Sequence, residues 1–316
     1  MTRQPARRHR GQAAFGLVLV TVPLLLAVAG PWFAGEPGPR GVSFTLGDGH
    51  WLGTDFTGRD VWRQILLGGR SVVLTAAAAT ALAYLIALPV GLAAALTHRV
   101  WLEELLMRPL DVVLAIPSLL LLLMTATLLS PSAAGLAVIV ALINVPDTTR
   151  MVRAAATEAA SRPAVEAMRA QGETWWRMAV GYTGRATLRT LTTDAGVRLT
   201  GVLYLVATAA FLGVGVTPDA ADWAAMVDQN RTGLLVQPWA VVVPALLIIA
   251  LTTGTNLLFD SGLASTGASA RNRTTRKISH ARDARDSHHT RDSRDTRAAR
   301  HGAGVAARSR GADRRP

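Results

Sequence analysis

Long uncharged, apolar runs alternate with short polar segments along most of this chain. The runs cover residues 11–35, 71–97, 112–146, 199–218 and 232–259. An α-helix rises about 1.5 Å per residue and the hydrocarbon core of a bilayer is about 30 Å thick, so about 20 apolar residues cross it once. Every run except 112–146 therefore predicts one transmembrane helix.

The run 112–146 is too long for one crossing, and it contains a turn signal, Ser130-Pro131-Ser132. Proline lacks an N–H and disfavours helix in the residue before it, so we expect two helices there. The sequence thus predicts an all-α, polytopic membrane protein with six transmembrane helices. The expected spans, within a membrane domain over 11–263, are 12–34, 71–97, 105–129, 133–152, 198–217 and 237–259.

The first apolar run has two interpretations. Residues 1–10 carry four arginines, and Ala27-Val28-Ala29 imitates a cleavage site, which together resemble a secretory signal. The run is longer than a typical signal core, however, and more spans follow it. This favours a first transmembrane helix behind a basic cytoplasmic N-terminus over 1–10.

The arginines also predict the orientation. Residues 147–198 hold eight arginines against five acidic residues, whereas 35–70 and 217–231 together hold five against seven. Positively charged loops are retained in the cytoplasm. We therefore expect the segment 153–197, which joins the fourth and fifth spans, and both termini on the cytoplasmic side.

Composition agrees with a membrane protein, because 50% of the residues are hydrophobic and only 17% are charged. The net charge of +12 is concentrated in residues 264–316, which cycle through Arg, Asp, Ser, Thr and His. Such a segment cannot bury enough apolar surface to offset chain entropy, so we expect a disordered, basic cytoplasmic tail. Contact with anionic membrane lipid is one role for it. Interleaved Asp residues favour a solvated tail and no specific nucleic acid.

The sequence lacks the residues and motifs that several kinds of catalytic and binding site require. The chain has no cysteine, and its one lysine, Lys277, precedes Ile278, so it contains no phosphate-binding loop of the G-x-x-x-x-G-K-[ST] type. Its histidines show no H-E-x-x-H spacing, and no Ser, His and Asp arrangement stands out. We expect no catalytic residue, no metal site and no cofactor, and hence a chain that is not an enzyme.

A short charged stretch between the fourth and fifth spans, Ser161 to Gly181, predicts two short helices. Pro163 suits a first helical position, and Gly172 suits a helix end that requires positive φ. The helix between them has about two turns. Because such a helix is unstable alone in water, we expect it to dock on a partner.

Three stretches together resemble one family. HWLGTDFTGRDVWRQILLGGR, from His50, resembles the segment that follows the first transmembrane helix in permease subunits of the dipeptide, oligopeptide and nickel family of bacterial ABC importers. FLGVGVTPDAADWAAMV, from Phe211, is similar to the stretch that leaves the fifth helix. EAMRAQG, from Glu166, resembles the family's E-A-A loop with Met168 in place of the second Ala. NLLFDSGL, from Asn256, resembles the end of the sixth helix, and the order and spacing of the stretches match.

The resemblance implies a type I permease in the bacterial inner membrane that forms half of the translocation path for peptides, nickel or similar small solutes. It implies three kinds of partner besides membrane lipid: a second homologous permease, two ABC ATPase subunits and an extracellular solute-binding protein. It assigns ATPase coupling to Glu166, Ala167 and Gly172. The other residues that carry it are, in the external signature, Gly53, Thr54, Asp55, Gly58, Arg59 and Asp60, and at the fifth-helix end, Phe211, Leu212, Gly213, Gly215 and Trp223.

Local roles follow for some of these residues. We expect Arg59 to bind Asp55 or Asp60 and brace the external segment, with substrate contact as the alternative. Trp223 and Trp239 flank the last external loop, which favours anchors at headgroup height, with contact with the binding protein as the alternative.

One departure from the family lies beyond Gly172, where VGYTGRATLRTL, from Val180, lacks the family's Leu-Pro. Gly181 and Gly184 offer another place for a bend. A divergent, poorly coupled permease is therefore one alternative. A membrane sensor or scaffold with a lipid- or nucleic-acid-binding tail is a second, and a passive channel is a third.

Overall fold

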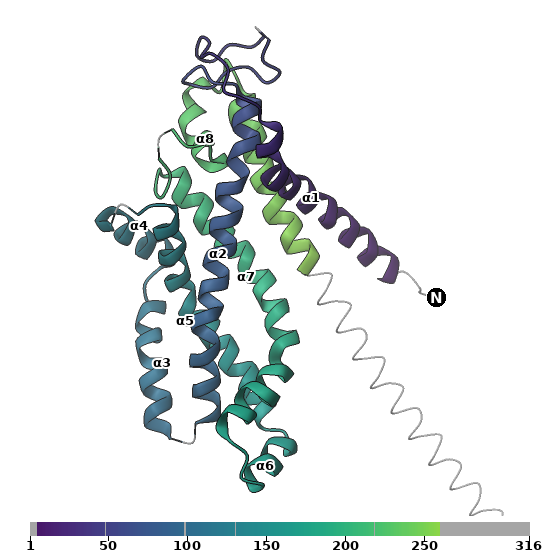
Figure 1. Cartoon of the computed structure of the whole chain (residues 1–316), viewed down its shortest axis with the longest axis vertical. Helices are drawn as coiled ribbons and strands as arrows, with labels where there is room; N and C mark the ends of the chain where they lie inside the picture. Colours follow the sequence, from purple (N-terminus) through teal and green to yellow (C-terminus); the bar gives the residue numbers. More distant parts are fainter. Residues whose placement is uncertain (1–4, 48, 98, 130, 218, 260–316) are drawn as a thin grey trace, which may run out of the picture. The chain divides into compact units, whose positions relative to one another are not determined.

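The computed structural model describes residues 5–47, 49–97, 99–129, 131–217 and 219–259 (Figure 1). The tail predicted over 264–316 lies outside the described residues. Within them the chain is built from helices, with two isolated β-bridges in the segment before the second helix.

Long helices alternate with short ones along the chain. Five of the described helices are long and apolar enough to cross a membrane, or six if the bent pair α3 and α4 counts as one span. This confirms the predicted fold class, an all-α polytopic membrane protein. The elements are α1 (Pro5–Phe33), α2 (Val61–Leu96), α3 (Val100–Leu114), α4 (Ser118–Leu129), α5 (Ala133–Ala160), α6 (Pro163–Ala170), a π-helical segment (Arg177–Gly184), α7 (Arg185–Phe211), α8 (Trp223–Asn230), a 3-10 turn (Arg231–Gly233) and the helix Trp239–Phe259.

The second helix begins well before the predicted position 71. Asp60 caps it: its carboxylate accepts hydrogen bonds from the backbone N–H groups of Trp62 at 2.8 Å and Arg63 at 3.5 Å. Such a cap satisfies N–H groups that the first turn leaves free. Position 71 is where the uncharged run begins, so the prediction located the apolar part of the helix. The helix itself begins earlier, at the residue that follows its cap.

The third predicted span, 105–129, is a bent pair of helices. α3 and α4 meet at an angle of 85°. Pro117 lies between them, and it has no N–H to continue the first helix and disfavours the helical conformation at Ile116.

The predicted segment 153–197 is mostly helical. α5 continues to Ala160, and helical structure resumes at Trp175 and runs through the π-helical segment into α7. The expected second short helix is therefore wrong as a separate element, because it is the beginning of the α7 rod. Gly181 and Gly184 both stay within that rod, where the hydrogen-bonding pattern widens to π-helical turns.

α2 lies along α5 and α7 in the middle of the helices (Figure 1). Its buried face carries small residues three or four positions apart, which lets neighbouring helices approach closely. At Gly91 the approach is so close that a Cβ atom would lie 2.6 Å from a methyl group of Val152 on α5. The small residues on this face are Ala76, Ala79, Ala83 and Ala87.

The two ends of the helices carry different polar structures. The segment 34–60 lies at one end, which the sequence predicts to be external, and we call it the loop end. α6 lies at the opposite end, predicted to be cytoplasmic, and we call it the α6 end (Figure 1).

Candidate functional site

The first part of the candidate site is α6, the helix on which the resemblance places ATPase coupling. Pro163 stands at its first turn, after Arg162 in an extended conformation (φ −74°, ψ 143°). A proline there breaks no hydrogen bond, because N–H groups of the first turn have no partner in the helix. Glu166 also lies in the first turn, where the helix dipole favours a carboxylate.

The other end of α6 is closed by a Schellman motif. The N–H of Glu173 donates to the carbonyl of Met168, and the N–H of Gly172 donates to the carbonyl of Arg169, both at 3.0 Å. Gly172 has φ of 74°, the left-handed conformation that its place in the sequence predicts. Both ends of this short helix are therefore set by local chemistry.

α6 presents most of its surface to solvent. Val165 is fully buried, whereas Glu166 and Ala167 are exposed. In the described part of the chain, Glu166 forms no ion pair with Arg162 or Arg169. One apolar side chain thus holds the helix on the protein and leaves its charged face open.

The external signature, residues 53–60, folds into a tight loop around Asp55. One carboxylate oxygen of Asp55 accepts hydrogen bonds from the backbone N–H groups of Thr57 and Arg59, each at 2.8 Å, and from the Thr57 hydroxyl at 2.7 Å. Gly53 and Gly58 adopt left-handed conformations, with φ of 72° and 74°. These glycines and this carboxylate make the loop self-supporting.

Buried Thr54 links the signature to the segment before it. Its hydroxyl donates to the carbonyl of Val42 at 2.6 Å and accepts from the N–H of Thr45 at 3.0 Å. Gly58 accepts a 2.8 Å hydrogen bond from the N–H of Gly41. The signature therefore organises the whole segment at the loop end.

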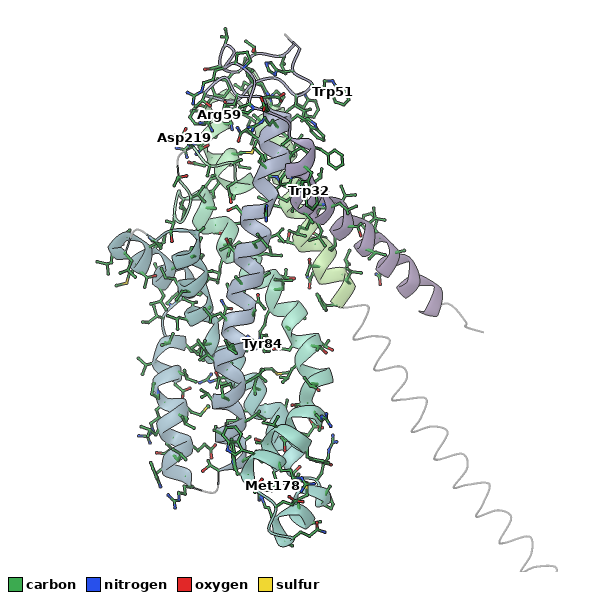
Figure 2. The ribbon with its side chains drawn as sticks, in the orientation of Figure 1. Trp32, Trp51, Arg59, Tyr84, Met178 and Asp219 are labelled. Carbon is green, nitrogen blue, oxygen red and sulfur yellow. The ribbon has the colours of Figure 1, made fainter. Side chains whose placement is uncertain are left out.

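The expected partner of Arg59 is wrong. Its guanidinium forms an ion pair with Asp219 and donates to the Asp219 carbonyl at 2.9 Å, rather than binding Asp55 or Asp60 (Figure 2). The N–H of Phe56 donates to the side chain of Asn230 at 2.9 Å. Residues far apart in sequence thus join the signature to the loop after α7 and to α8.

The fifth-helix end is a second Schellman motif. α7 ends at Phe211, after which the N–H of Val214 donates to the carbonyl of Ala209 at 2.8 Å and the N–H of Gly213 to that of Ala210 at 3.0 Å. Gly213 and Gly215 have φ of 76° and 77°, while Phe211 and Leu212 are partly exposed. Gly213 and Gly215 also line an open cavity of about 620 Å³ beside the start of α5.

Trp223 is not the interfacial anchor that the sequence predicts. Its side chain is fully buried, and its indole N–H donates to the backbone carbonyl of Ile65 at 2.8 Å. The ring lies against Gly68 and Gly69 of α2. Trp239 is 46% exposed, so of these two tryptophans it is the one with the exposure expected of an anchor.

Asp222 precedes Trp223 and caps α8. Its carboxylate accepts from the backbone N–H groups of Ala224 at 2.9 Å and Ala225 at 3.2 Å. Burial raises the pKa of Asp222 above its ordinary value, although hydrogen bonds from Ser71, Ala225 and Ala224 act in the opposite direction.

Comparison with known proteins decides which family this is. Residues 87–261 match the model of the family described as binding-protein-dependent transport system inner membrane component. A protein of Brucella abortus named as a peptide permease is 31% identical over 82% of this chain and 88% of its own length. The chain belongs to this family of transport permeases.

Two further relatives support the assignment. A protein of Escherichia coli named as a D,D-dipeptide transport system permease is 29% identical over 77% of this chain and 83% of its own length. A glutathione transport system permease protein of Pectobacterium atrosepticum is 26% identical over 67% of this chain and 70% of its own length. The permease is thus an inner membrane component of a transport system by its family.

The permease also contains a charged cluster that sequence reasoning missed. Arg198 of α7 donates from Nε to Asp194 and from Nη1 to Asp147 of α5, both at 2.6 Å, and from Nη2 to the Asp147 carbonyl at 3.2 Å. Tyr84 of α2 donates its hydroxyl to the same oxygen of Asp194 at 2.5 Å. Asp194 and Arg198 are four residues apart on a predicted helix, and this spacing alone would have predicted an ion pair between them. Their partners on α5 and α2 could not be identified from that spacing.

Proposed function

We propose that this chain is the permease subunit of an ATP-driven importer, in which it forms half of the translocation path for peptides or similar small solutes delivered by a binding protein. The observation that supports this most is α6, a capped helix with an open charged face, on a chain of this family. A second homologous permease, two ATPase subunits and a solute-binding protein complete the proposed complex.

In this proposal α6 is the coupling helix that docks on an ATPase subunit. An isolated helix of eight residues is unstable in water, and here the proline start, the Schellman end and buried Val165 hold it ready for a partner. Glu166 then pairs with a cationic group of the ATPase. The adjacent Trp175 and Trp176, with ring centroids 4.8 Å apart, are 37% and 70% exposed and extend the docking surface.

The energy for transport comes from the partner. The full sequence contains no phosphate-binding loop of its own, so nucleotide acts through the ATPase subunits. Nucleotide binding moves the coupling helices and shifts the permease between inward-facing and outward-facing states. Such a shift requires that nucleotide bind the two states of the complex with different affinities.

Peptides are the solute class that the comparisons support. The relatives described above carry peptide, D,D-dipeptide and glutathione in their names, and nickel appears in none of those three. We therefore place peptides before nickel as the cargo of this chain.

The test is co-purification of the tagged chain with an ATP-binding subunit from its native membranes. We expect Glu166→Ala to reduce the recovered ATPase and the ATP-dependent uptake of a labelled dipeptide by about tenfold, in line with the loss of an interface hot spot. Glu158→Ala is the matched control, because Glu158 is an exposed glutamate on neighbouring α5. Dipeptide uptake that persists without an ATPase would establish a passive channel instead.

Removal of residues 264–316 separates the transporter from a sensor or scaffold. We expect the shortened chain to retain dipeptide uptake. Normal membrane insertion with loss of all function would instead favour a protein that acts through its tail.

A further inference from the structure

α5 has a weak point in the middle of its length. Pro146 removes one backbone hydrogen bond from the helix. The side chains of Thr148 and Thr149 bond back to the carbonyls of Asn144 and Val145, each at 2.7 Å, and such bonds help to bend helices. The part of α5 beyond Pro146, which leads to α6, is therefore joined to the rest through a bend point.

α7 is also irregular on its α6 side. The π-helical segment Arg177–Gly184 separates α6 from the regular helix that begins at Arg185. π-helical turns are less regular than α-helix and frequently lie at functional positions. The helices on either side of α6, α5 and α7, are thus both interrupted. A movement of α6 would therefore not be transmitted rigidly into the membrane part by either helix alone.

Arg198 lies beyond the π-helical segment on α7, and it joins α7 to α5 on the α6 side of Pro146. It binds the side chain and the carbonyl of Asp147, the residue directly after Pro146, while it holds Asp194 on its own helix. Asp194 in turn accepts the hydroxyl of Tyr84 on α2, which Figure 2 shows between the loop end and the α6 end. The side chains of Arg198 and Asp194 are only 13% and 15% exposed, so the bond between them is little weakened by solvent and holds the guanidinium in place for Asp147.

Apolar packing nearby does not replace this link. Leu92 of α2, Val152 and Ala156 of α5 and Leu191 of α7 form a small buried cluster on the α6 side of Arg198. Dispersion contacts are not directional, whereas an arginine that binds a carboxylate and a carbonyl fixes both distance and orientation.

We propose that Arg198 is a positioning residue for transport: it clamps α7 to α5 next to Pro146, so that the two helices carrying α6 move as one body. This rests on the proposed function, in which α6 receives movement from an ATPase. The clamp then passes the movement of the α6 side of α5 to the regular part of α7, and this route avoids the bend point of α5 and the π-helical turns before α7.

The decisive variant is Asp147→Ala. It removes the charged bond of the clamp and leaves only the longer bond from Arg198 to the backbone carbonyl of residue 147, at 3.2 Å. The Asp147 side chain is 64% exposed, and Arg198 stays paired with Asp194, so no buried charge is stranded. Asp111→Ala is the matched control: Asp111 also pairs with an arginine of α5, Arg150, at 2.5 Å and is 48% exposed, but it joins α5 to α3.

The first measurement uses the full chain alone in lipid nanodiscs. The sequence has no cysteine, so spin labels can be placed at Glu158→Cys on α5 and Leu188→Cys on α7, both exposed positions, without other substitutions. We expect Asp147→Ala to broaden the label-to-label distance distribution about twofold, because the bond that holds α7 to α5 is lost. Asp111→Ala should leave the distribution unchanged. An unchanged distribution in Asp147→Ala would overturn the clamp.

The second measurement uses the complete complex in proteoliposomes. We expect Asp147→Ala to lower the dipeptide moved per ATP hydrolysed about tenfold, a typical size for a coupling free energy, while ATP hydrolysis stays within about twofold of the unmodified complex. A broadened distribution with unchanged transport per ATP would overturn the proposal, and so would a parallel loss of hydrolysis and transport. If the unmodified complex moves no dipeptide, the proposed function fails, and the spin-label result still decides the clamp.

Discussion

The indole N–H of Trp223 donates a 2.8 Å hydrogen bond to the backbone carbonyl of Ile65, and this bond ties α8 to α2 inside the protein. The close approach depends on two glycines of α2, Gly68 and Gly69, that lie against the indole ring. The ring and Ile65 belong to one buried cluster at the loop end. This contact fixes the segment after α7 on the rest of the protein.

Gly69→Ala should therefore destabilise the protein. An added Cβ would overlap the ring of Trp223, and overpacking of this kind costs about 1–3 kcal/mol. Gly201→Ala is the control, because Gly201 has open space around it in α7 and alanine favours helix by about 1 kcal/mol. Thermal unfolding in detergent, followed by tryptophan fluorescence, should show a lower midpoint for Gly69→Ala only. Equal midpoints would mean that α8 can move away from α2 at little cost.

Gly172→Ala should weaken the end of α6. An alanine in the left-handed conformation of Gly172 costs about 1–2 kcal/mol. Hydrogen–deuterium exchange of the peptide that contains α6 should become faster by about one order of magnitude, which corresponds to that cost. Gly181→Ala, in the π-helical segment, should leave the exchange of α6 unchanged, since Gly181 has no positive φ and meets its nearest neighbour at 3.7 Å.

Asp55→Ala should disturb the loop end far more than Arg59→Ala does. Asp55 is 4% exposed and holds three donors, and stranding buried donors costs about 1–3 kcal/mol. Arg59 pairs with Asp219, whose side chain is 85% exposed, and ion pairs of this kind contribute about 0–1 kcal/mol. Limited proteolysis between α1 and α2 should be faster in Asp55→Ala than in Arg59→Ala. The reverse order would show that the Asp219 contact dominates.

Asp222→Asn should change how stability depends on pH. Burial raises the pKa of Asp222, so the folded protein binds this proton more tightly than the unfolded chain. The free energy of unfolding therefore falls as pH rises from the unfolded pKa to the raised folded value, and the loss is complete above it. Asparagine is neutral and still caps a helix.

The variant should accordingly lose this pH dependence and equal or exceed the unmodified protein in stability at neutral pH. The measurement is the thermal midpoint over a series of pH values. Asp228→Asn is the control, because Asp228 lies on the same helix with its side chain 34% exposed. A midpoint that drops in Asp222→Asn at neutral pH would show that the charged carboxylate stabilises α8.

The local features of α6 follow from its own residues. Pro163 and Gly172 act on the backbone where they stand, so the start and the end of this helix could be expected from the sequence. The continuation into α7 could not, because the absence of a Leu-Pro pair does not say whether Gly181 and Gly184 bend the chain or remain helical. The structure keeps both inside one rod with π-helical turns.

The sequence by itself determined the helical class, the apolar segments and the glycine positions, because these depend on hydropathy and on the backbone freedom of single residues. Tertiary structure alone decided that Arg59 binds Asp219, that Trp223 is buried against α2, and that Arg198 joins α7 to α5. Each of these contacts connects residues more than 50 positions apart. Which long-range partner a side chain meets depends on how the helices pack, and the pattern along one chain does not contain that information.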